Sequence, residues 1–195
     1  MLGEGGGNRV ITLNEAIEDV HYKLLGEIPL LPGEDPAALA QLWQEVRLVL
    51  QPVDFIDKIL ARDFVKLFWE EQRLYRLKAE FLKSSAHLGL ELILKLHVEY
   101  GRRQEFIERW AQGDPKTVEE VNEILSRAGL NRETITAETY FIKLREMENI
   151  DRMIAAQELR RNNALRELTH HREFVARSLM AIAHKQRGPI DVPDE

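Results

Sequence analysis

Hydrophobic residues recur every three or four positions along most of this chain, which is the spacing that places them on one face of an α-helix. The first such run spans residues 13–25. Thr12 and Glu15 have the spacing of a capping box, in which each side chain accepts an otherwise unpaired N–H of the first turn. Gly26 follows the run and is a typical helix end. A short helix is therefore predicted over residues 13–25.

Two aspartate-proline pairs predict where further helices begin. In Asp35-Pro36 and Asp114-Pro115 the aspartate is a favourable N-cap, and proline is tolerated at the first helical position because its missing N–H would be unpaired there. Helices are predicted after these pairs, over residues 37–50 and 116–128. Gln51-Pro52 ends the first, and Gly129 ends the second.

The middle of the chain has a wide apolar stripe from residue 54 onward, which is typical of a central helix. Two serines and a glycine within residues 84–89 predict a break or a kink. A second apolar segment over residues 88–100 is expected to end at Gly101. A short helix is then predicted over residues 104–111.

The last part of the chain predicts one very long helix. No glycine or proline occurs between Thr134 and Gln186, so a helix of roughly 50 residues and about 75 Å is expected. Read as heptads, its apolar seam comprises Tyr140, Leu144, Met147, Ile154, Leu165, Leu168, Val175, Leu179 and Ile182. Four charged residues interrupt the seam, namely Asp151, Glu158, Arg161 and Arg172. The helix is therefore coiled-coil-like with an imperfect seam.

These elements predict an all-α protein, in which a compact helical bundle is followed by one very long, coiled-coil-like C-terminal helix. The expected organisation is a flexible N-terminus at 1–11, the helical bundle at 12–130, the long helix at 131–187 and an acidic tail at 188–195.

Composition narrows the possible chemistry. The 195 residues are 44% hydrophobic and 31% charged, which suffices for a folded core, and none is cysteine. Disulfides, thiolate nucleophiles and cysteine-bound metals are thereby excluded. The chain shows neither a secretory signal nor an apolar run of membrane-spanning length, so a cytoplasmic protein without membrane contact is expected.

The charge is unevenly distributed. The formal net charge is −6, yet residues 159–187, which we call the basic arm, carry seven basic side chains and two acidic ones. Candidate contacts to nucleic acid or to an acidic partner are Arg160, Arg161, Arg166, Arg172, Arg177 and Lys185. Arginines along one helix can neutralise phosphates, but basic helices more often pair with acidic protein surfaces.

A carboxylate and histidine metal site is the main catalytic alternative. Glu18 with His21 and Glu167 with His170 each have the Glu-x-x-His spacing that supplies two ligands from one helix face, and Glu70, Glu80 or Glu99 would complete such a site. Acidic residues are so common here that one or two such spacings are expected by chance. No phosphate-binding loop, nucleophile elbow or zinc-protease helix is present. The sequence thus predicts no catalytic residue, no metal ligand and no cofactor.

Two segments carry a resemblance to a known group of proteins. LPGEDPAALAQLW with WEEQRLYRLK, and IDRMIAAQELRRNNALRELTHHR, are similar to segments of a family of uncharacterised, all-helical bacterial proteins. The resemblance covers most of residues 31–174. It implies a helical fold and a bacterial origin, and it assigns no function.

The function expected from these features is that of a non-enzymatic interaction or scaffold protein that acts through its long helix. A long helix is stabilised mainly by burial of an apolar face, so its distal apolar residues need a covering surface. These candidate self-association residues are Leu165, Leu168, Val175, Leu179 and Ile182. A second copy would make a homodimer, and folding back onto the bundle is the alternative. The other expectations are a nucleic-acid-associated protein that uses the basic arm, and a carboxylate and histidine metal-binding bundle.

Overall fold

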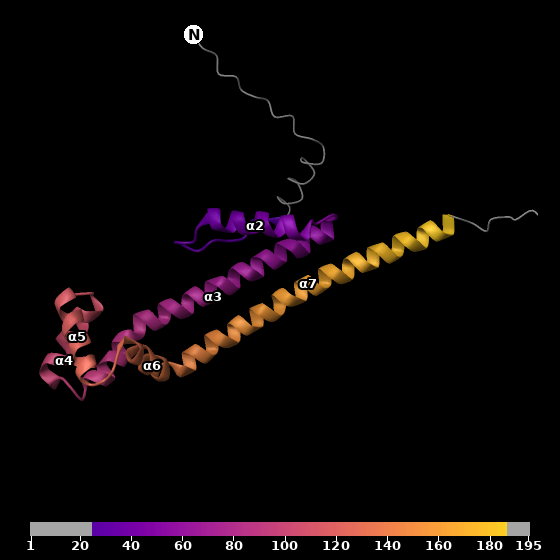
Figure 1. Cartoon of the computed structure of the whole chain (residues 1–195). Coiled ribbons are helices and arrows are strands. Elements are labelled where there is room, and N and C mark those ends of the chain that lie inside the picture. Colours follow the sequence, from indigo (N-terminus) through magenta and orange to yellow (C-terminus); the bar gives the residue numbers. More distant parts are fainter. Residues whose placement is uncertain (1–24, 187–195) are drawn as a thin grey trace, which may run out of the picture. The chain divides into compact units, whose positions relative to one another are not determined.

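A computed structural model describes residues 25–186, and the regular structure in this range is helical. The helices are α2 (Pro36–Leu50), α3 (Phe55–Leu94), α4 (Tyr100–Ala111), α5 (Pro115–Arg127), α6 (Arg132–Ile142) and α7 (Leu144–Gln186) (Figure 1). The predicted all-α class with a long last helix is confirmed. The predicted helix at 13–25, apart from Leu25, and the predicted segments 1–11 and 188–195 lie outside the described residues.

Both predicted aspartate-proline helix starts are confirmed. Asp35 accepts the N–H of Ala37 at 2.8 Å, and Pro36 is the first residue of α2. Asp114 likewise accepts the N–H of Thr117 at 3.0 Å at the start of α5. Each carboxylate pairs a backbone donor that the helix itself cannot satisfy, so local chemistry alone fixes these two starts.

Helix α3 runs without a break from Phe55 to Leu94, so the predicted kink within residues 84–89 is wrong. Gly89 has a packing role instead. A Cβ added there would lie 2.4 Å from the carbonyl oxygen of Ile135 and 2.8 Å from the nitrogen of Thr139. The backbone of α6 therefore approaches α3 so closely at this point that only glycine fits. Gly101, which was expected to end a helix, lies in the first turn of α4.

The predicted single helix from Thr134 to Gln186 is interrupted at Lys143. Helix α6 ends at Ile142, and Lys143 has φ −102° and ψ 20° before α7 begins. Packing explains the interruption: Ile135 of α6 and Met147 of α7 belong to two different apolar clusters. Tertiary contacts that pull two segments to separate clusters leave no glycine or proline signal in the sequence.

By their contacts, the described residues form two compact units. The first unit contains α2, α3 as far as Trp69, and α7 from Leu159 onward, whereas the second unit is Glu70–Glu158. Helices α3 and α7 contribute to both. The predicted bundle of residues 12–130 and the predicted arm of 131–187 therefore do not coincide with the two units.

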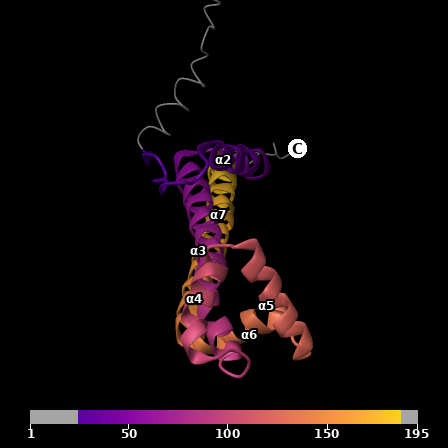
Figure 2. The same cartoon turned by 90° about the vertical axis from the view of Figure 1, so that its left-hand side faces the viewer.

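The second unit contains two apolar clusters. One joins the C-terminal part of α3 to α4, α5 and α6 (Figure 2), and its buried members are Leu90, Ile93, Leu94, Ile107, Val121, Leu125 and Ile135. The other joins α3 to the first turns of α7 through Leu74, Met147, Ile150 and Ile154. An ion pair between Lys78 Nζ and Asp151 Oδ1, at 2.6 Å, links the same two helices.

The first unit packs α2, α3 and the outer part of α7 together. Its buried apolar side chains are Val46, Ala61, Val65, Trp69 and Leu168. The guanidinium of Arg161 in α7 lies over the ring of Phe68 in α3, 5.9 Å from the ring centroid. This stretch of α7 is therefore docked on α3, and it positions the residues that follow it.

The cap of α5 gives a pH-dependent prediction. Hydrogen bonds from the hydroxyl and the N–H of Thr117, with a further one from Arg109, lower the pKa of Asp114 below its ordinary value of 3.8. A lowered pKa in the folded state adds stability above the unfolded-state pKa, and this stability is lost as the pH falls through the folded pKa. We expect the chain to be more stable than its Asp114→Asn variant at neutral pH. That difference should vanish on acidification below 3.8 in urea unfolding, and a difference that persists in acid would contradict it.

Candidate functional site

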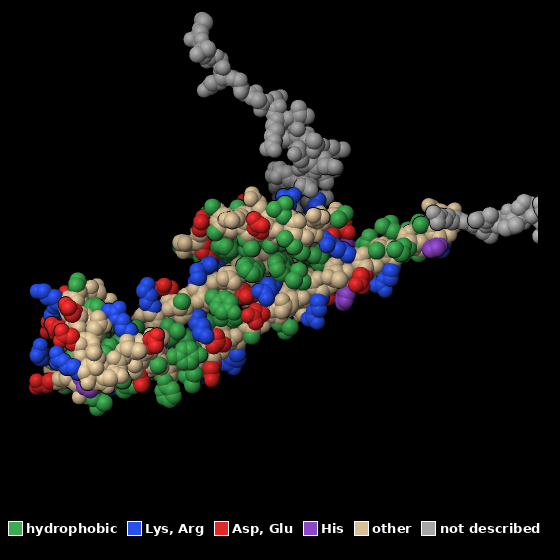
Figure 3. Space-filling view, in the orientation of Figure 1, with side chains coloured by type: hydrophobic (Ala, Val, Ile, Leu, Met, Phe, Trp, Pro, Cys, Tyr) green, Lys and Arg blue, Asp and Glu red, His purple; other side chains and the backbone are tan. Residues whose placement is uncertain are grey.

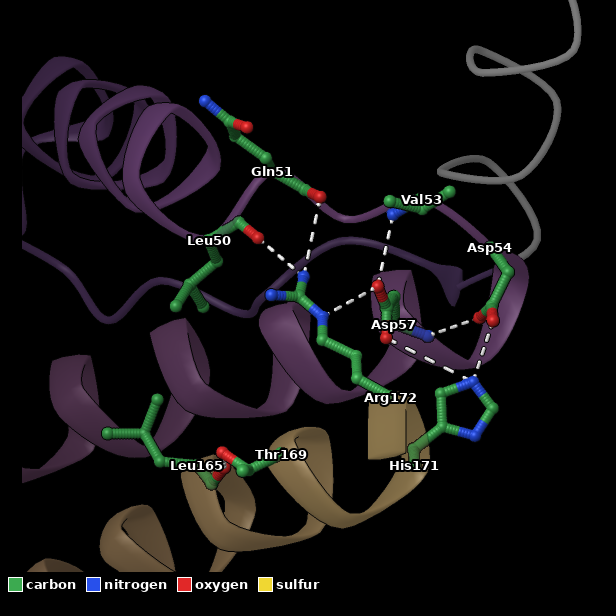
Figure 4. Close-up of polar contacts among 9 residues, drawn as sticks. All are labelled: Leu50, Gln51, Val53, Asp54, Asp57, Leu165, Thr169, His171 and Arg172. Atoms are coloured by element: carbon green, nitrogen blue, oxygen red, sulfur yellow. Dashed lines mark hydrogen bonds and ion pairs between the residues drawn. The ribbon is translucent and has the colours of Figure 1, made fainter. Parts of the chain in front are cut away.

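A cluster of charged side chains surrounds the start of α3 (Figure 4). Asp54 immediately precedes the helix, and its Oδ1 accepts the N–H of Asp57 at 2.8 Å. In return, Oδ2 of Asp57 accepts the N–H of Val53 at 3.1 Å. The two carboxylates thus satisfy backbone donors at the helix N-terminus, where negative charge is also favoured by the helix dipole.

Arg172 connects α7 to this helix start. Its Nε donates to Asp57 Oδ2 at 3.0 Å, and its Nη2 donates to the carbonyl oxygens of Leu50 and Gln51 at the end of α2. A cation beside the last carbonyls of a helix is favourable for the same dipole reason. One guanidinium therefore joins the end of α2, the start of α3 and the outer part of α7.

His171 faces both carboxylates. Its Nε2 lies 2.7 Å from Asp54 Oδ2 and 4.0 Å from Asp57 Oδ1. Burial raises the pKa of Asp54, but the N–H of Asp57 and the His171 imidazole together favour the charged carboxylate more strongly, so the pKa lies below its ordinary value. We call Asp54, Asp57, His171 and Arg172 the Asp54 cluster.

One atom of the cluster is left unsatisfied. Asp57 is 1% exposed, and its Oδ1 is buried without a hydrogen-bond partner. The other oxygen of the same carboxylate accepts two hydrogen bonds, from Val53 and Arg172. A buried carboxylate oxygen without a partner is uncommon, because the lost hydration is not replaced.

The candidate residues of the basic arm divide into two groups. Arg161 and Arg172 contact their own chain, at Phe68 and at the Asp54 cluster respectively. The side chains of Arg160, Arg166, Arg177 and Lys185 are exposed. Of these, Arg166 donates to Asn163 and Arg177 donates to the carbonyl oxygen of Glu173, both within α7.

The candidate self-association residues divide in the same way. Leu168 is buried, whereas Leu165 and Val175 are partly buried against the first unit. Leu179 and Ile182 are 62% and 53% exposed. Folding back onto the bundle therefore does not cover these two residues. Sequence analysis missed Phe174 and Met180, which are exposed beside them because they lie off the heptad seam.

The end of α7 extends past the helices that cover the rest of its outer part. Asp54, just before α3, lies against His171, and α7 continues to Gln186 (Figure 1). Residues 173–186 span about 21 Å at the rise of an α-helix. Hydrophobic side chains are visible along this end in the space-filling view (Figure 3). We call Phe174, Val175, Leu179, Met180 and Ile182 the terminal apolar face.

The two metal sites considered from the sequence have different outcomes. Glu167 and His170 are exposed and belong to no group of three close ligands, and Glu18 and His21 lie outside the described residues. Within residues 25–186, one group of three potential ligands lies within 4.8 Å, namely Asp54, Asp57 and His171. Sequence reasoning missed this group, because His171 is 117 positions from Asp54 and only the packing of α7 brings them together.

Comparisons with protein-family models, with curated proteins and with solved structures give no match for this chain. The chemistry of its sites therefore rests on their own geometry. No helix within residues 25–186 combines the length and the apolar character required to cross a membrane.

Proposed function

We propose that this chain is a non-enzymatic interaction protein, and that the end of α7 is its docking element. The observation that carries the proposal is the exposure of the terminal apolar face on a helix that has already passed the start of α3. Such a short amphipathic stretch is weakly stabilised in isolation, so burial of its apolar face against a partner is favoured.

The partner we propose is a second copy of the same chain. Val175, Leu179 and Ile182 continue the stripe that α3 covers further back along α7, and their four-then-three spacing is that of a helix-helix seam. Small side chains flank this seam at Ala176 and Ala183, which allows two helices to approach closely. A symmetric dimer buries the same face on both copies, so one patch suffices for both subunits.

Nucleic acid is the less favoured partner. Between Leu159 and Gln186, the exposed cations are Arg160, Arg166, Arg177 and Lys185, and the exposed carboxylates are Glu167 and Glu173. Because Arg161 and Arg172 engage their own chain, the exposed surface of this stretch has a small net charge. Affinity for phosphates grows with the number of cations that reach them, so strong binding at physiological salt is not expected.

Mass measurement tests the proposed dimer. We expect light scattering to give twice the 22.7 kDa chain mass at micromolar concentration for the natural sequence. The double variant Leu179→Gln and Ile182→Gln keeps good helix formers but removes the apolar seam, so it should give a monomer. The far-ultraviolet circular dichroism of this variant should be unchanged, since neither side chain is buried in the monomer.

Leu159→Gln provides the matched control. Leu159 is also an exposed leucine of α7, at 59%, but it lies outside the terminal apolar face. This variant should retain the dimer mass. A monomer for the natural sequence, or equal masses for the natural chain and the double variant, would contradict the proposal.

A further inference from the structure

We infer that the Asp54 cluster is a binding site for one divalent transition-metal ion, with Zn²⁺ as its reference ligand. The three ligand atoms are Asp54 Oδ2, Asp57 Oδ1 and His171 Nε2. This inference is independent of the proposed dimer, because none of these residues belongs to the terminal apolar face.

The hydrogen bonds divide each carboxylate into a held oxygen and a facing oxygen (Figure 4). Asp54 Oδ1 is held by the N–H of Asp57, while its Oδ2 faces His171 at 2.7 Å. Asp57 Oδ2 is held by Val53 and Arg172, while its Oδ1 faces His171 at 4.0 Å. Outer hydrogen bonds that orient carboxylate ligands in this way are a regular feature of protein metal sites.

The unsatisfied oxygen of Asp57 is the independent observation that points to a ligand. A histidine and aspartate ion pair alone would account for Asp54 and His171, but it leaves this buried Oδ1 without a partner. A cation between the three ligand atoms supplies that partner. The oxygen is directed toward His171 rather than toward solvent, which is where a shared ion would lie.

The ligand types select the class of metal. Two carboxylate oxygens and one imidazole nitrogen suit Zn²⁺ and similar transition-metal ions, whereas Ca²⁺ and Mg²⁺ prefer oxygen ligands alone. Zinc bonds to these atoms are about 2.0–2.2 Å, so tetrahedral ligands lie roughly 3.3 Å apart. The observed 2.7 Å and 4.0 Å separations lie on either side of that value, and small side-chain movements bring the atoms into place. Water would complete the coordination.

Metal binding would strengthen the attachment of α7 to the start of α3. Two ligands belong to α3 or the residue before it, and the third belongs to α7, 114 positions after Asp57 in the numbering. An ion that binds the folded chain and not the unfolded chain stabilises it by mass action. We expect saturating Zn²⁺ to raise the melting temperature by roughly 5 °C.

The test is a Zn²⁺ titration of the full chain, followed by calorimetry and by the melting temperature. We expect saturable binding of one ion per chain. His171→Gln keeps a hydrogen-bond donor for Asp54 but removes the imidazole ligand, so it should weaken binding at least about tenfold. Its melting temperature in chelator should stay close to that of the natural chain, which separates loss of the ligand from loss of the fold.

His170→Gln is the matched control, because His170 is the neighbouring, exposed histidine outside the cluster. This variant should bind Zn²⁺ like the natural chain. A direct readout on the natural chain is nuclear magnetic resonance of its histidine side chains, in which Zn²⁺ should shift Nε2 of His171. The inference is overturned if the natural chain does not bind Zn²⁺ saturably, if His171→Gln binds as tightly as the natural chain, or if that Nε2 signal does not move.

Discussion

Replacing Gly89 with alanine is expected to destabilise the second unit by about 3 kcal/mol. The new methyl group would lie 2.3 Å from Thr139 Oγ1 and 2.4 Å from the Ile135 carbonyl oxygen, and the latter belongs to the backbone of α6. Side-chain rotation cannot relieve that overlap, so α6 has to move away from α3. Its movement would disturb the apolar cluster that contains Ile135 and Leu90.

The sign of this effect distinguishes packing from helix propensity. Alanine in place of a helical glycine otherwise stabilises a helix by up to about 1 kcal/mol. Gly101 provides the control, because it is also helical and an added Cβ there would meet nothing within 4 Å. Gly101→Ala should therefore be neutral or slightly stabilising in urea unfolding. A Gly89→Ala variant as stable as the natural chain would show that the close approach of α6 to α3 is wrong.

Replacing Arg172 with methionine is expected to cost about 2 kcal/mol of folding free energy. The substitution removes the charged partner of Asp57, whose carboxylate is buried, and it removes the donor to the last carbonyls of α2. Removal of one partner from a buried ion pair costs about 3–5 kcal/mol. The lower figure applies here because the Arg172 side chain is 41% exposed and water replaces part of the interaction.

Arg177→Met is the matched control for this substitution. Arg177 lies one and a half turns further along α7, and its printed bond is to the carbonyl oxygen of Glu173 in the same helix. Its replacement should change stability by less than about 0.5 kcal/mol. In a double-mutant cycle, Asp57→Asn combined with Arg172→Met should cost less than the sum of the two single changes. Equal effects of the Arg172 and Arg177 variants, or strict additivity, would contradict the role assigned to Arg172.

Local signals in the sequence predicted most helix boundaries correctly. Asp35-Pro36 and Asp114-Pro115 fix helix starts through bonds that involve only neighbouring residues. Gly129 ends α5 in the left-handed conformation that glycine favours, with φ 72°. These features depend on the chain within a few positions, so a sequence pattern contains them.

The errors occurred where distant packing decides the structure. Gly89 was interpreted as a helix breaker, whereas it is required by the close approach of α6. Lys143 carries no breaking signal, and the helix is interrupted there because α6 and α7 contact different clusters.

The candidate sites follow the same division. The terminal apolar face was predicted in part, from Val175, Leu179 and Ile182, because its seam lies within a single helix. The Asp54 cluster was not predicted, since Asp57 and His171 come together only when α7 docks on α3. Asp54 and Asp57 by themselves have the spacing of ordinary helix-start residues, so the sequence gives no separate signal for their second role.

The measurement that most directly tests the central proposal is the distance between the ends of α7 in two copies. The natural chain contains no cysteine, so Ala181→Cys, at an exposed position among the last turns, can carry a single spin label. Paired helices lie 8–10 Å apart, and with label lengths added the spins of two copies should be within about 30 Å in either helix orientation. The self-pairing proposal predicts such a distance in pulsed dipolar spectroscopy. The absence of any dipolar signal at concentrations above micromolar would contradict it.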